Sequence, residues 1–396
     1  MPALLETLFA DETRRDPYAV YRQLRSQTPV FNDPTTGLWV ALDYDSVKRV
    51  LNDHELFSSR LGPAFWMTFL DPPKHTKLRA LISQAFTPKS IANLEPQIVR
   101  FCQQLLRPLL ERDEIDLVAD FSAQLPMLVI SEMLGLPATD GPQFWRWNEI
   151  ILNMSYTIPG GANAGGATEA FKEATAEMND YLGTILAQRQ AEPQRDLLTR
   201  LLQAEVDGER LSQEDILGFF QLLLLAATET TTNLITNAIL CFIENPEQLE
   251  KLRAVPGLLP SAIEEALRYR SPLHWMFRVT RQDVDLQGCT VPAGRVILAM
   301  IGAANRDPKQ FPEPDRFEVA RDPNPHIAFG HGVHFCLGAA LARMEARAAL
   351  DYLLKNMEQF ELTGPTSWEP RKGLHVHGPA RLPLKFRTRR ELISES

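Results

Sequence analysis

The sequence predicts a mainly α-helical protein with small β-sheets, built as a single large domain over residues 1–396. From about residue 88 to residue 255 the pattern of apolar side chains is helical, and only a few proline-containing breaks interrupt it. Strand-like runs are short and lie outside that region. No internal repeat, low-complexity run or linker-like change of composition divides the chain. One large helical domain is therefore the simplest account of the sequence.

The remaining elements follow from local turn chemistry. In chain order they are two short strands within 28–41, a helix over 44–51, paired strands over 284–286 and 296–299, a proline-rich irregular tract over 306–325 and a helix over about 337–355. A continuous helix over 214–244 is predicted inside the helical region, because a capping sequence opens it and Asn245-Pro246 follows its end. These boundaries place every motif discussed below on a helix or a loop.

Composition and charge exclude several classes of function. A net charge of −9 argues against a nucleic-acid partner, since phosphate binding needs a positive surface. Acidic residues occur too early in the N-terminal segment for a signal peptide or a spanning helix, so we expect a cytoplasmic protein without a membrane anchor. The cysteines form no C-x-x-C pair and must be judged one by one. Cys102, Cys241 and Cys289 are expected to be small buried hydrophobes.

Cys336 has unusual neighbours. Gly332 and Gly338 allow the backbone to approach a bulky group, and the helix that follows favours a thiolate over a thiol. His334 supplies a hydrogen-bond donor near the same surface. A buried structural thiol is the ordinary alternative, and a catalytic nucleophile would need a base that the chain does not clearly supply. A thiolate ligand of haem iron fits all of these features.

The helix over 214–244 changes character in its middle. Its first half is almost wholly apolar, and then comes the polar run Thr228-Glu229-Thr230-Thr231-Thr232-Asn233 before apolar residues resume. One interpretation is that the helix simply reaches the surface there. The other is that Glu229 and Thr230 are buried, which costs free energy unless they are satisfied and suggests that they handle protons or water.

Two further pairs of charged residues have helical spacing. Glu265 and Arg268 lie three residues apart on one face of a helix. They could form a surface ion pair, or a buried pair that supports the loop around Cys336 (residues 328–338, here called the cysteine loop). His75 and Arg79 lie four apart and share a helical face that suits an anion, although a solvated basic face is equally compatible. Arg278 and His334 are further cations, and the two propionates of haem would give all four cations a role.

Taken together, these residues resemble the bacterial cytochrome P450 family, with matches in order from about residue 15 to residue 386. The family's cysteine signature is matched by Phe329, Gly332, His334, Cys336 and Gly338. Glu265 and Arg268 match its Glu-x-x-Arg pair, and His75 and Arg79 match its propionate-binding pair. Its oxygen-binding motif is matched by Ala226, Thr228, Glu229 and Thr230. Its stretch before the haem loop is matched by Ala304-Asn305-Arg306-Asp307-Pro308 with Phe311. Ala227 departs from the pattern, because the family most often has glycine there.

The resemblance implies a triangular, mainly helical fold with haem b between the long central helix and the cysteine loop. Cys336 would be the axial iron ligand, and Thr230 with Glu229 would direct protons to bound O2. The implied activity is a monooxygenase that hydroxylates or epoxidises a lipophilic substrate. Electrons from NAD(P)H would arrive through a ferredoxin or flavodoxin with its reductase, for which Arg343 and Arg347 are candidate contacts. A non-oxidative haem-thiolate isomerase or dehydratase and a haem-binding sensor remain as alternatives.

The resemblance also places a substrate pocket. Its expected lining is aromatic and apolar, from Phe65, Trp66, Met67, Phe69, Leu223, Ala226, Leu273, His274, Trp275 and the residues around Leu374 to His377, including Val376. Such a lining suggests a terpenoid, steroid, polyketide or fatty acid. Each aromatic residue could equally be ordinary core. The Gly/Ala-rich stretch over 160–167 is predicted to be a flexible entry loop.

Overall fold

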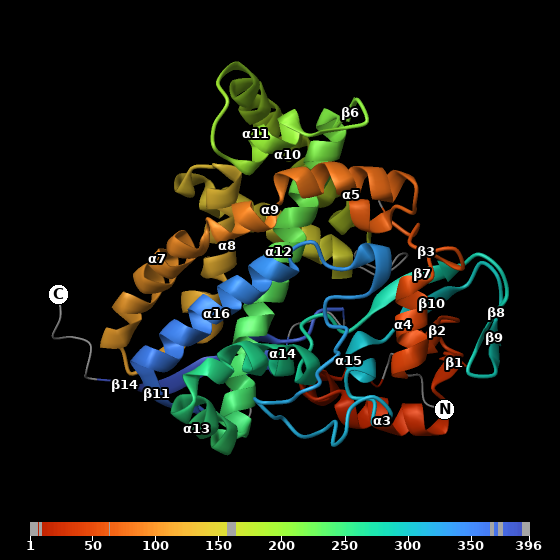
Figure 1. Ribbon diagram of the computed structural model, residues 1–396, viewed down its shortest axis with the longest axis vertical. Helices are drawn as coiled ribbons and strands as arrows, with labels where there is room; N and C mark the ends of the chain where they lie inside the picture. Colours follow the sequence, from red (N-terminus) through yellow and green to blue (C-terminus); the bar gives the residue numbers. More distant parts are fainter. Residues whose placement is uncertain are drawn as a thin grey trace. The chain divides into compact units, whose positions relative to one another are not determined.

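The structure is a computed structural model that describes residues 7, 10–62, 64–156, 164–364, 368–370 and 375–389. The chain, whose helices and strands are labelled in Figure 1, groups into two compact units, each assembled from separate segments. Unit 1 comprises Met1–Ser59, Cys102–Gln124 and Thr230–Ser396, and unit 2 comprises Arg60–Phe101 and Leu125–Glu229. The boundary between Glu229 and Thr230 falls inside the continuous helix α12 (Gln213–Glu244). The expectation of one domain over 1–396 stays a prediction.

Unit 1 holds most of the β-structure. Its helices are α2 (Asp11–Arg15), α3 (Tyr18–Gln27), α4 (Tyr44–Asn52), α13 (Pro246–Ala254), α14 (Leu259–Tyr269), α15 (Ile301–Ala304) and α16 (Ala339–Asn356). Its strands are β1 (Val30–Asn32), β2 (Trp39–Ala41), β3 (Phe57–Ser58), β4 (Glu114–Asp116), β7 (Met276–Thr280), β8 (Val284–Leu286), β9 (Cys289–Val291), β10 (Val296–Ala299), β11 (Met357–Leu362), β12 (Glu369–Pro370), β13 (Pro379–Arg381) and β14 (Pro383–Thr388). The mainly helical fold with small sheets is confirmed.

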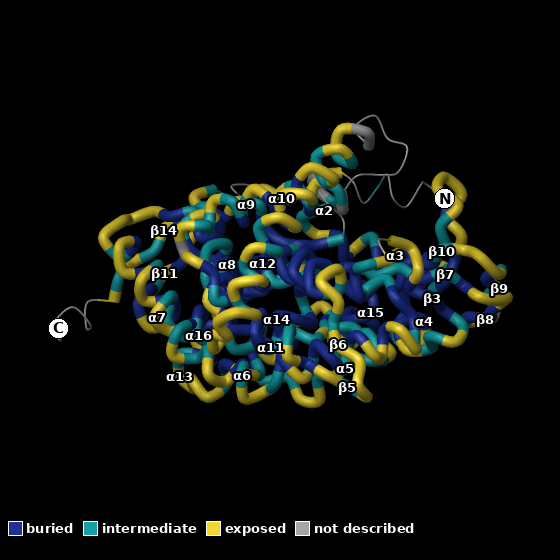
Figure 2. The backbone as a smooth tube through the Cα atoms, turned by 90° about the horizontal axis from the view of Figure 1, so that it is seen from above, coloured by how far each residue is buried: buried dark blue, intermediate teal, exposed yellow. Residues whose placement is uncertain are grey.

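The largest sheet of unit 1 has the strand order β1-β2-β10-β7-β3. Successive strand residues face opposite sides, so Val30 and Ala41 join the core that contains α4, whereas Phe31 and Val40 join the core that contains α3. The next element, α15, is buried throughout, as the dark blue tube beside its label in Figure 2 shows. The tract over 305–338, which contains Cys336, follows α15 directly in the chain, so its first residue is attached to this packed region.

Unit 2 is almost entirely helical. Its elements are α5 (Lys74–Ala85), α6 (Pro88–Ala92), α8 (Gln124–Leu134), α9 (Gly141–Tyr156), α10 (Ala164–Ala191), α11 (Leu197–Gln203) and the short strands β5 (Glu205–Val206) and β6 (Glu209–Arg210). Helix α7 (Glu95–Leu106) belongs to unit 2 up to Phe101 and to unit 1 from Cys102. The first residue of α8, Gln124, is the last residue of a unit 1 segment. On α9 and α10, the Glu177 carboxylate accepts hydrogen bonds from Arg146 and from Trp147 Nε1. These bonds hold the two long helices of unit 2 together.

Three expectations from the sequence need correction. The strands over 284–286 and 296–299 do not pair with each other, because the tight turn at Gln287 and Gly288, both with positive φ, pairs β8 with β9 instead. The last helix begins at Ala339 rather than 337, because Gly338 forms its N-cap. Residues 164–167 of the expected entry loop belong to α10, and residues 160–163 lie outside the described residues.

Candidate functional site

The loop that carries Cys336 is held by backbone geometry and by α4. Gly330 and Gly332 both have φ of +74°, a left-handed conformation that other residues adopt only with strain. A Cβ on Gly332 would come within 2.9 Å of the Asn52 Cα at the end of α4. The Cys336 amide donates to the Phe329 carbonyl at 2.9 Å. Gly332 is therefore required for packing within the chain itself, whatever the loop binds.

Cys336 differs from the other three cysteines. Burial raises the pKa of the Cys102 and Cys241 thiols to about 12, and the Cys289 thiol donates to the Val30 carbonyl. Cys336 is exposed and lies just before α16, and a Cβ on Gly338 would meet only its sulfur, at 4.0 Å. An accessible sulfur beside glycine backbone, at the positive end of a helix, fits a thiolate that binds a large cofactor. The residues present therefore fit a haem group at Cys336.

The other unit 1 residues that the sequence singled out lie around this loop and on the sheet. His334, in the short helix Gly332–His334, is linked through Nε2 to Ser59 Oγ at 3.0 Å. Arg278 on β7 is only 3% exposed and donates to its neighbour's carbonyl. Phe329 is partly buried next to Phe335. Burial of Arg278 shows that this cation is not part of a solvated basic face.

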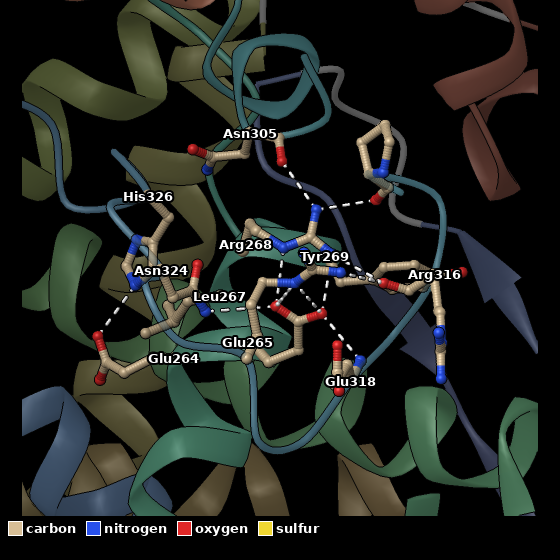
Figure 3. Close-up of polar contacts among 12 residues, drawn as sticks. Glu264, Glu265, Leu267, Arg268, Tyr269, Asn305, Arg316, Glu318, Asn324 and His326 are labelled. Atoms are coloured by element: carbon tan, nitrogen blue, oxygen red, sulfur yellow. Dashed lines mark hydrogen bonds and ion pairs between the residues drawn. The ribbon is translucent and has the colours of Figure 1, made fainter. Parts of the chain in front are cut away.

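Glu265 and Arg268 on α14 form a fully buried, two-bond ion pair (Figure 3). Arg268 also donates to the carbonyls of Asn305, Pro314 and Arg316, while Glu265 accepts from the Glu318 amide and from Arg321 and Asn324. A surface ion pair is excluded by this burial. Because Asn305 Oδ1 in turn accepts from the Ile327 amide, the pair fixes the tract that leads into the cysteine loop.

A second set of contacts, which sequence reasoning missed, begins at the neighbouring residue Glu264. Its carboxylate binds His326 Nε2 at 2.9 Å and the guanidinium of Arg343 at 2.6 and 2.8 Å. Burial alone would raise the pKa of Glu264, but the hydrogen bonds from Arg343 and His326 lower it to about 2. The spacing gave no signal for this set, because its members come from three separate segments of the chain.

In unit 2, His75 and Arg79 lie on α5. His75 is 1% exposed and Arg79 is half-buried, so this helical face is not simply solvated. The helix begins at Lys74, and the His75 amide donates to the carbonyl of the buried residue Asp71 at 3.0 Å. His75 therefore lies in the first turn of α5, and Arg79 follows about one turn later.

The middle of α12 combines buried polar groups with an accessible face. Thr228 and Glu229 are buried, and the Thr228 hydroxyl bonds the Leu224 carbonyl and lies 3.1 Å from Asn148 Oδ1 on α9. In contrast, Ala226 is exposed, and Ala227 and Thr230 are partly exposed, in the middle of a long helix. The idea that α12 simply reaches the surface here does not fit, because Thr231, Thr232 and Asn233 are also buried.

The candidate pocket residues fall into two groups. In unit 2, Trp66 stacks on Phe69 with ring centroids 5.9 Å apart and donates from Nε1 to Gln221 on α12. Gly218 accommodates this segment, since a Cβ there would lie 2.1 Å from the Phe65 carbonyl oxygen. Leu223 is buried on the same helix, and Met67 is buried beside Trp66 in the 3-10 helix Met67–Phe69. The structure therefore brings this group together on the first half of α12.

The second group lies in unit 1. Leu273 and Val376 form an isolated antiparallel bridge. The ring centroids of Trp275 and His375 lie 4.6 Å apart. The His274 imidazole is bonded to the Tyr21 hydroxyl at 2.9 Å and stacks on His377. His274 is thus tied into the core of unit 1. Leu374 lies outside the described residues.

Among the described residues, no three or more His, Cys, Asp or Glu side chains are arranged to hold a metal ion. No helix in the described part of the chain is long and apolar enough to cross a bilayer.

Comparison with known proteins points to one family. A family model described as "Cytochrome P450" matches residues 4–254 and 257–380. The chain is 38% identical to "Cytochrome P450 109" of Bacillus spizizenii, with 96% of this chain and 95% of that protein covered. It is 35% identical to "Vitamin D(3) 25-hydroxylase" of Pseudonocardia autotrophica, covering 95% of each. The crystal structure of CYP109E1 from Bacillus megaterium in complex with testosterone is 37% identical with a TM-score of 0.86, covering 93% of this chain and 99% of that one.

Proposed function

The chain belongs to the cytochrome P450 family, and from that premise we propose that Cys336 is the thiolate ligand of a haem b group. The protein is an oxidoreductase, a monooxygenase that acts on lipophilic substrates. The observation that carries the assignment of Cys336 is its exposed sulfur beside Gly338, at the start of α16. The Cys336 amide, bonded to the Phe329 carbonyl, holds the sulfur in place.

Haem bound there would supply an iron that binds and activates O2. A second contribution of the chain itself would come from α12. The Thr230 hydroxyl, on the accessible face, would donate a proton to the O2 co-substrate, and the buried carboxyl of Glu229 would return a proton to that hydroxyl. Ala226 would contact the cofactor, and the Ala227 methyl would occupy part of the space that glycine leaves in most relatives.

Four cations are proposed to bind the two propionates of haem. His75 and Arg79 would act from α5, Arg278 would act from β7, and His334 would act from the cysteine loop. The match of His75 and Arg79 to the family's propionate-binding pair and their shared helical face support this proposal. Phe329 and Gly338 would contact the macrocycle on the side of the cysteine.

We infer that electrons come from a redox partner, a ferredoxin or flavodoxin with its NAD(P)H-dependent reductase, because relatives in the family take electrons from redox partners. The sequence has no C-x-x-C pair that would suggest an iron–sulfur cluster of its own. Arg343, a candidate contact for that partner, has its guanidinium bonded to Glu264 and stacked on Phe329. Its principal role is therefore internal, and Arg347 remains the candidate for the partner.

The substrate is proposed to be a lipophilic molecule of about the size of a steroid. A relative is named as a hydroxylase of vitamin D(3), and a similar structure was determined with testosterone. The aromatic group of Phe65, Trp66 and Phe69 supports an apolar ligand in unit 2. Leu223 in unit 2, and Leu273, Trp275 and Val376 in unit 1, are the other proposed apolar contacts, and His274 is tied into the core of unit 1. No observation favours the isomerase, dehydratase or sensor alternatives.

The test of this proposal is the carbon monoxide difference spectrum of the reduced protein with Cys336→Ala beside the wild type. We expect the strongly red-shifted Soret band of a thiolate-ligated haem in the wild type and its loss in the variant. Cys289→Ala is the matched control, because it removes a partly buried thiol that bonds only a backbone carbonyl. A wild-type band of the histidine-ligated kind, or an unchanged band in Cys336→Ala, would overturn the assignment.

A further inference from the structure

Glu264 contacts the chain on both sides of Cys336. His326, which precedes the cysteine loop, meets Glu264 Oε2 at 2.9 Å, and Arg343, on the helix after the loop, binds both carboxylate oxygens of Glu264. Glu264 itself comes from α14, a helix distant in sequence from both. One carboxylate therefore connects the entry and the exit of the cysteine loop. Figure 3 shows the Glu264 to His326 contact beside the separate cluster around Glu265.

The hydrogen-bond pattern fixes the tautomer of His326. The Ala328 amide can only donate, and it donates to His326 Nδ1 at 3.2 Å. The ring proton must then lie on Nε2, where it is donated to the Glu264 carboxylate. The His326 side chain is only 4% exposed, so both bonds are sheltered from water. His326 thus couples Glu264 to the backbone at the start of the loop.

Arg343 couples Glu264 to the backbone near the sulfur. Its guanidinium lies 4.4 Å from the centroid of the Phe329 ring, within the range of a cation–π contact. The Phe329 carbonyl accepts the hydrogen bond from the Cys336 amide at 2.9 Å. A guanidinium held in two-bond geometry by Glu264 therefore fixes the residue that holds Cys336.

These contacts exceed those of an ordinary surface ion pair. The side chains of Arg343 and Glu264 are 38% and 30% exposed, and an isolated pair at that exposure would contribute little. Here the same carboxylate has three hydrogen bonds, one of them to a His326 side chain that is 4% exposed, and both of its partners contact the cysteine loop. Removal of the carboxylate would release both partners at once.

We propose that Glu264, His326 and Arg343 form a clamp that positions Cys336 as a thiolate ligand. The inference rests on the proposed function, because it takes Cys336 to be the haem ligand. The three residues, here called the Glu264 clamp, are positioning residues, since none of them contacts the reacting atoms. When the clamp is intact, the Phe329 carbonyl stays bonded to the Cys336 amide and the sulfur keeps its place. When the clamp is opened, the loop moves and the thiolate is protonated or displaced more easily.

The main variant is Glu264→Gln in the haem-loaded protein. Glutamine keeps the volume, but its amide nitrogen cannot accept a proton from His326 Nε2, and its neutral oxygen holds Arg343 less strongly. The ferrous carbon monoxide complex is held in mild guanidinium chloride, and conversion from the red-shifted thiolate form to the blue-shifted form is followed. We expect the conversion to be about tenfold faster than in the wild type, since a charged hydrogen-bond pair is lost. Hydrogen exchange at the Ala328 and Cys336 amides should accelerate in parallel.

The matched control is Glu250→Gln, which removes one carboxylate from an exposed ion pair with Arg253 on α13 in the same unit. It changes the net charge equally and should leave conversion and exchange unchanged. Arg343→Lys keeps the charge but loses the two-bond fork and the planar stacking on Phe329, so we expect an intermediate rate. This second variant tests the clamp even if Glu264→Gln folds poorly.

The outcomes separate the two proposals. The clamp alone would be overturned by one result. In that result the wild type has a normal thiolate spectrum, and Glu264→Gln and Arg343→Lys convert no faster than Glu250→Gln. A wild type without the thiolate spectrum would overturn the assignment of Cys336 and the clamp with it. Faster conversion that merely follows a lower midpoint of global unfolding would also overturn the positioning role, because it would report general destabilisation.

Discussion

At the scale of single residues, Arg268 is a buried cation that supports the tract before the cysteine loop. It is fully buried, bonds Glu265 with two nitrogens and satisfies three backbone carbonyls. Replacement by alanine leaves those carbonyls and part of a buried carboxylate without donors. A buried charge that loses its partner costs far more than the net contribution of an intact pair.

We therefore expect Arg268→Ala to lower the free energy of unfolding by about 3–5 kcal/mol. The measurement is guanidinium chloride unfolding of the haem-loaded protein. Arg316→Ala is the control, because that side chain is 56% exposed and forms an ion pair with Glu313 that is worth at most about 1 kcal/mol. Similar losses in both variants would show that the buried network is not a main support of the fold.

The same residues show what sequence spacing reveals and what it does not. Glu265 and Arg268 could be identified because they lie three apart on one helix, and their spacing alone indicated a pair. Burial of the pair could not be read from the sequence, since it depends on the carbonyls of the 305–316 tract. The Glu264 clamp was missed for the same reason. Its partners at His326 and Arg343 are brought near only by the fold, so no local pattern marks them.

At the scale of elements, the packing of the cysteine loop against α4 depends on Gly332. Its φ of +74° is unfavourable for alanine, and the added Cβ would meet the Asn52 backbone at 2.9 Å. Gly288, in the turn between β8 and β9, has a φ of +77°, but no atom lies within 4 Å of the position that a Cβ would take there. The two glycines thus differ in packing but share the backbone strain.

We expect Gly288→Ala to lower the free energy of unfolding by about 1 kcal/mol through strain alone. Gly332→Ala should cost about 1–3 kcal/mol more, because α4 or the loop must shift. It should also lower the fraction of protein that shows the thiolate spectrum, whereas Gly288→Ala should not. Thermal unfolding and the carbon monoxide spectrum measure the two effects. Equal losses in stability and no spectral change would mean that the loop tolerates the shift.

Long elements were predicted more accurately than the pairing of short ones. The helix over 214–244 is present as α12 with a shift of one residue at its start, because its apolar run and capping sequence are local signals. Both strands at 284–286 and 296–299 were located correctly. Their partners were not, because the choice of β9 for β8 depends on a two-residue turn, and the choice of β2 and β7 for β10 depends on distant segments.

At the scale of the molecule, a histidine cluster joins the N-terminal, central and C-terminal segments of unit 1. His274 bonds the Tyr21 hydroxyl and lies with its ring centroid 4.2 Å from that of His377, and His377 Nε2 donates to the Arg14 carbonyl. Both imidazoles are at least nine-tenths buried. Burial lowers the pKa of His377 to about 3 and holds the pKa of His274 well below 6.5, with Arg270 and Arg306 nearby adding to both effects.

These pKa values predict that acid weakens the fold. In the unfolded chain each histidine takes up a proton as the pH falls below about 6.5, whereas in the folded protein both stay neutral until far lower pH. The unfolded state therefore binds more protons, and stability falls as the pH falls. Each histidine contributes a slope of up to about 1.4 kcal/mol per pH unit below the unfolded pKa. Above that pH the contribution is constant.

The variant that tests this is His377→Gln, which can still donate to the Arg14 carbonyl but does not titrate. Urea unfolding between pH 7.5 and 4.5 should show a slope that is shallower than in the wild type by about 1 kcal/mol per pH unit in the acidic part of the range. A parallel pair of curves would mean that the pKa of His377 is the same in the folded and unfolded states. Because the cluster connects three distant segments, acid should also release the N-terminal segment, seen as lower hydrogen-exchange protection factors around Tyr21 at pH 4.5 than at pH 7.5, after correction for the pH dependence of intrinsic exchange.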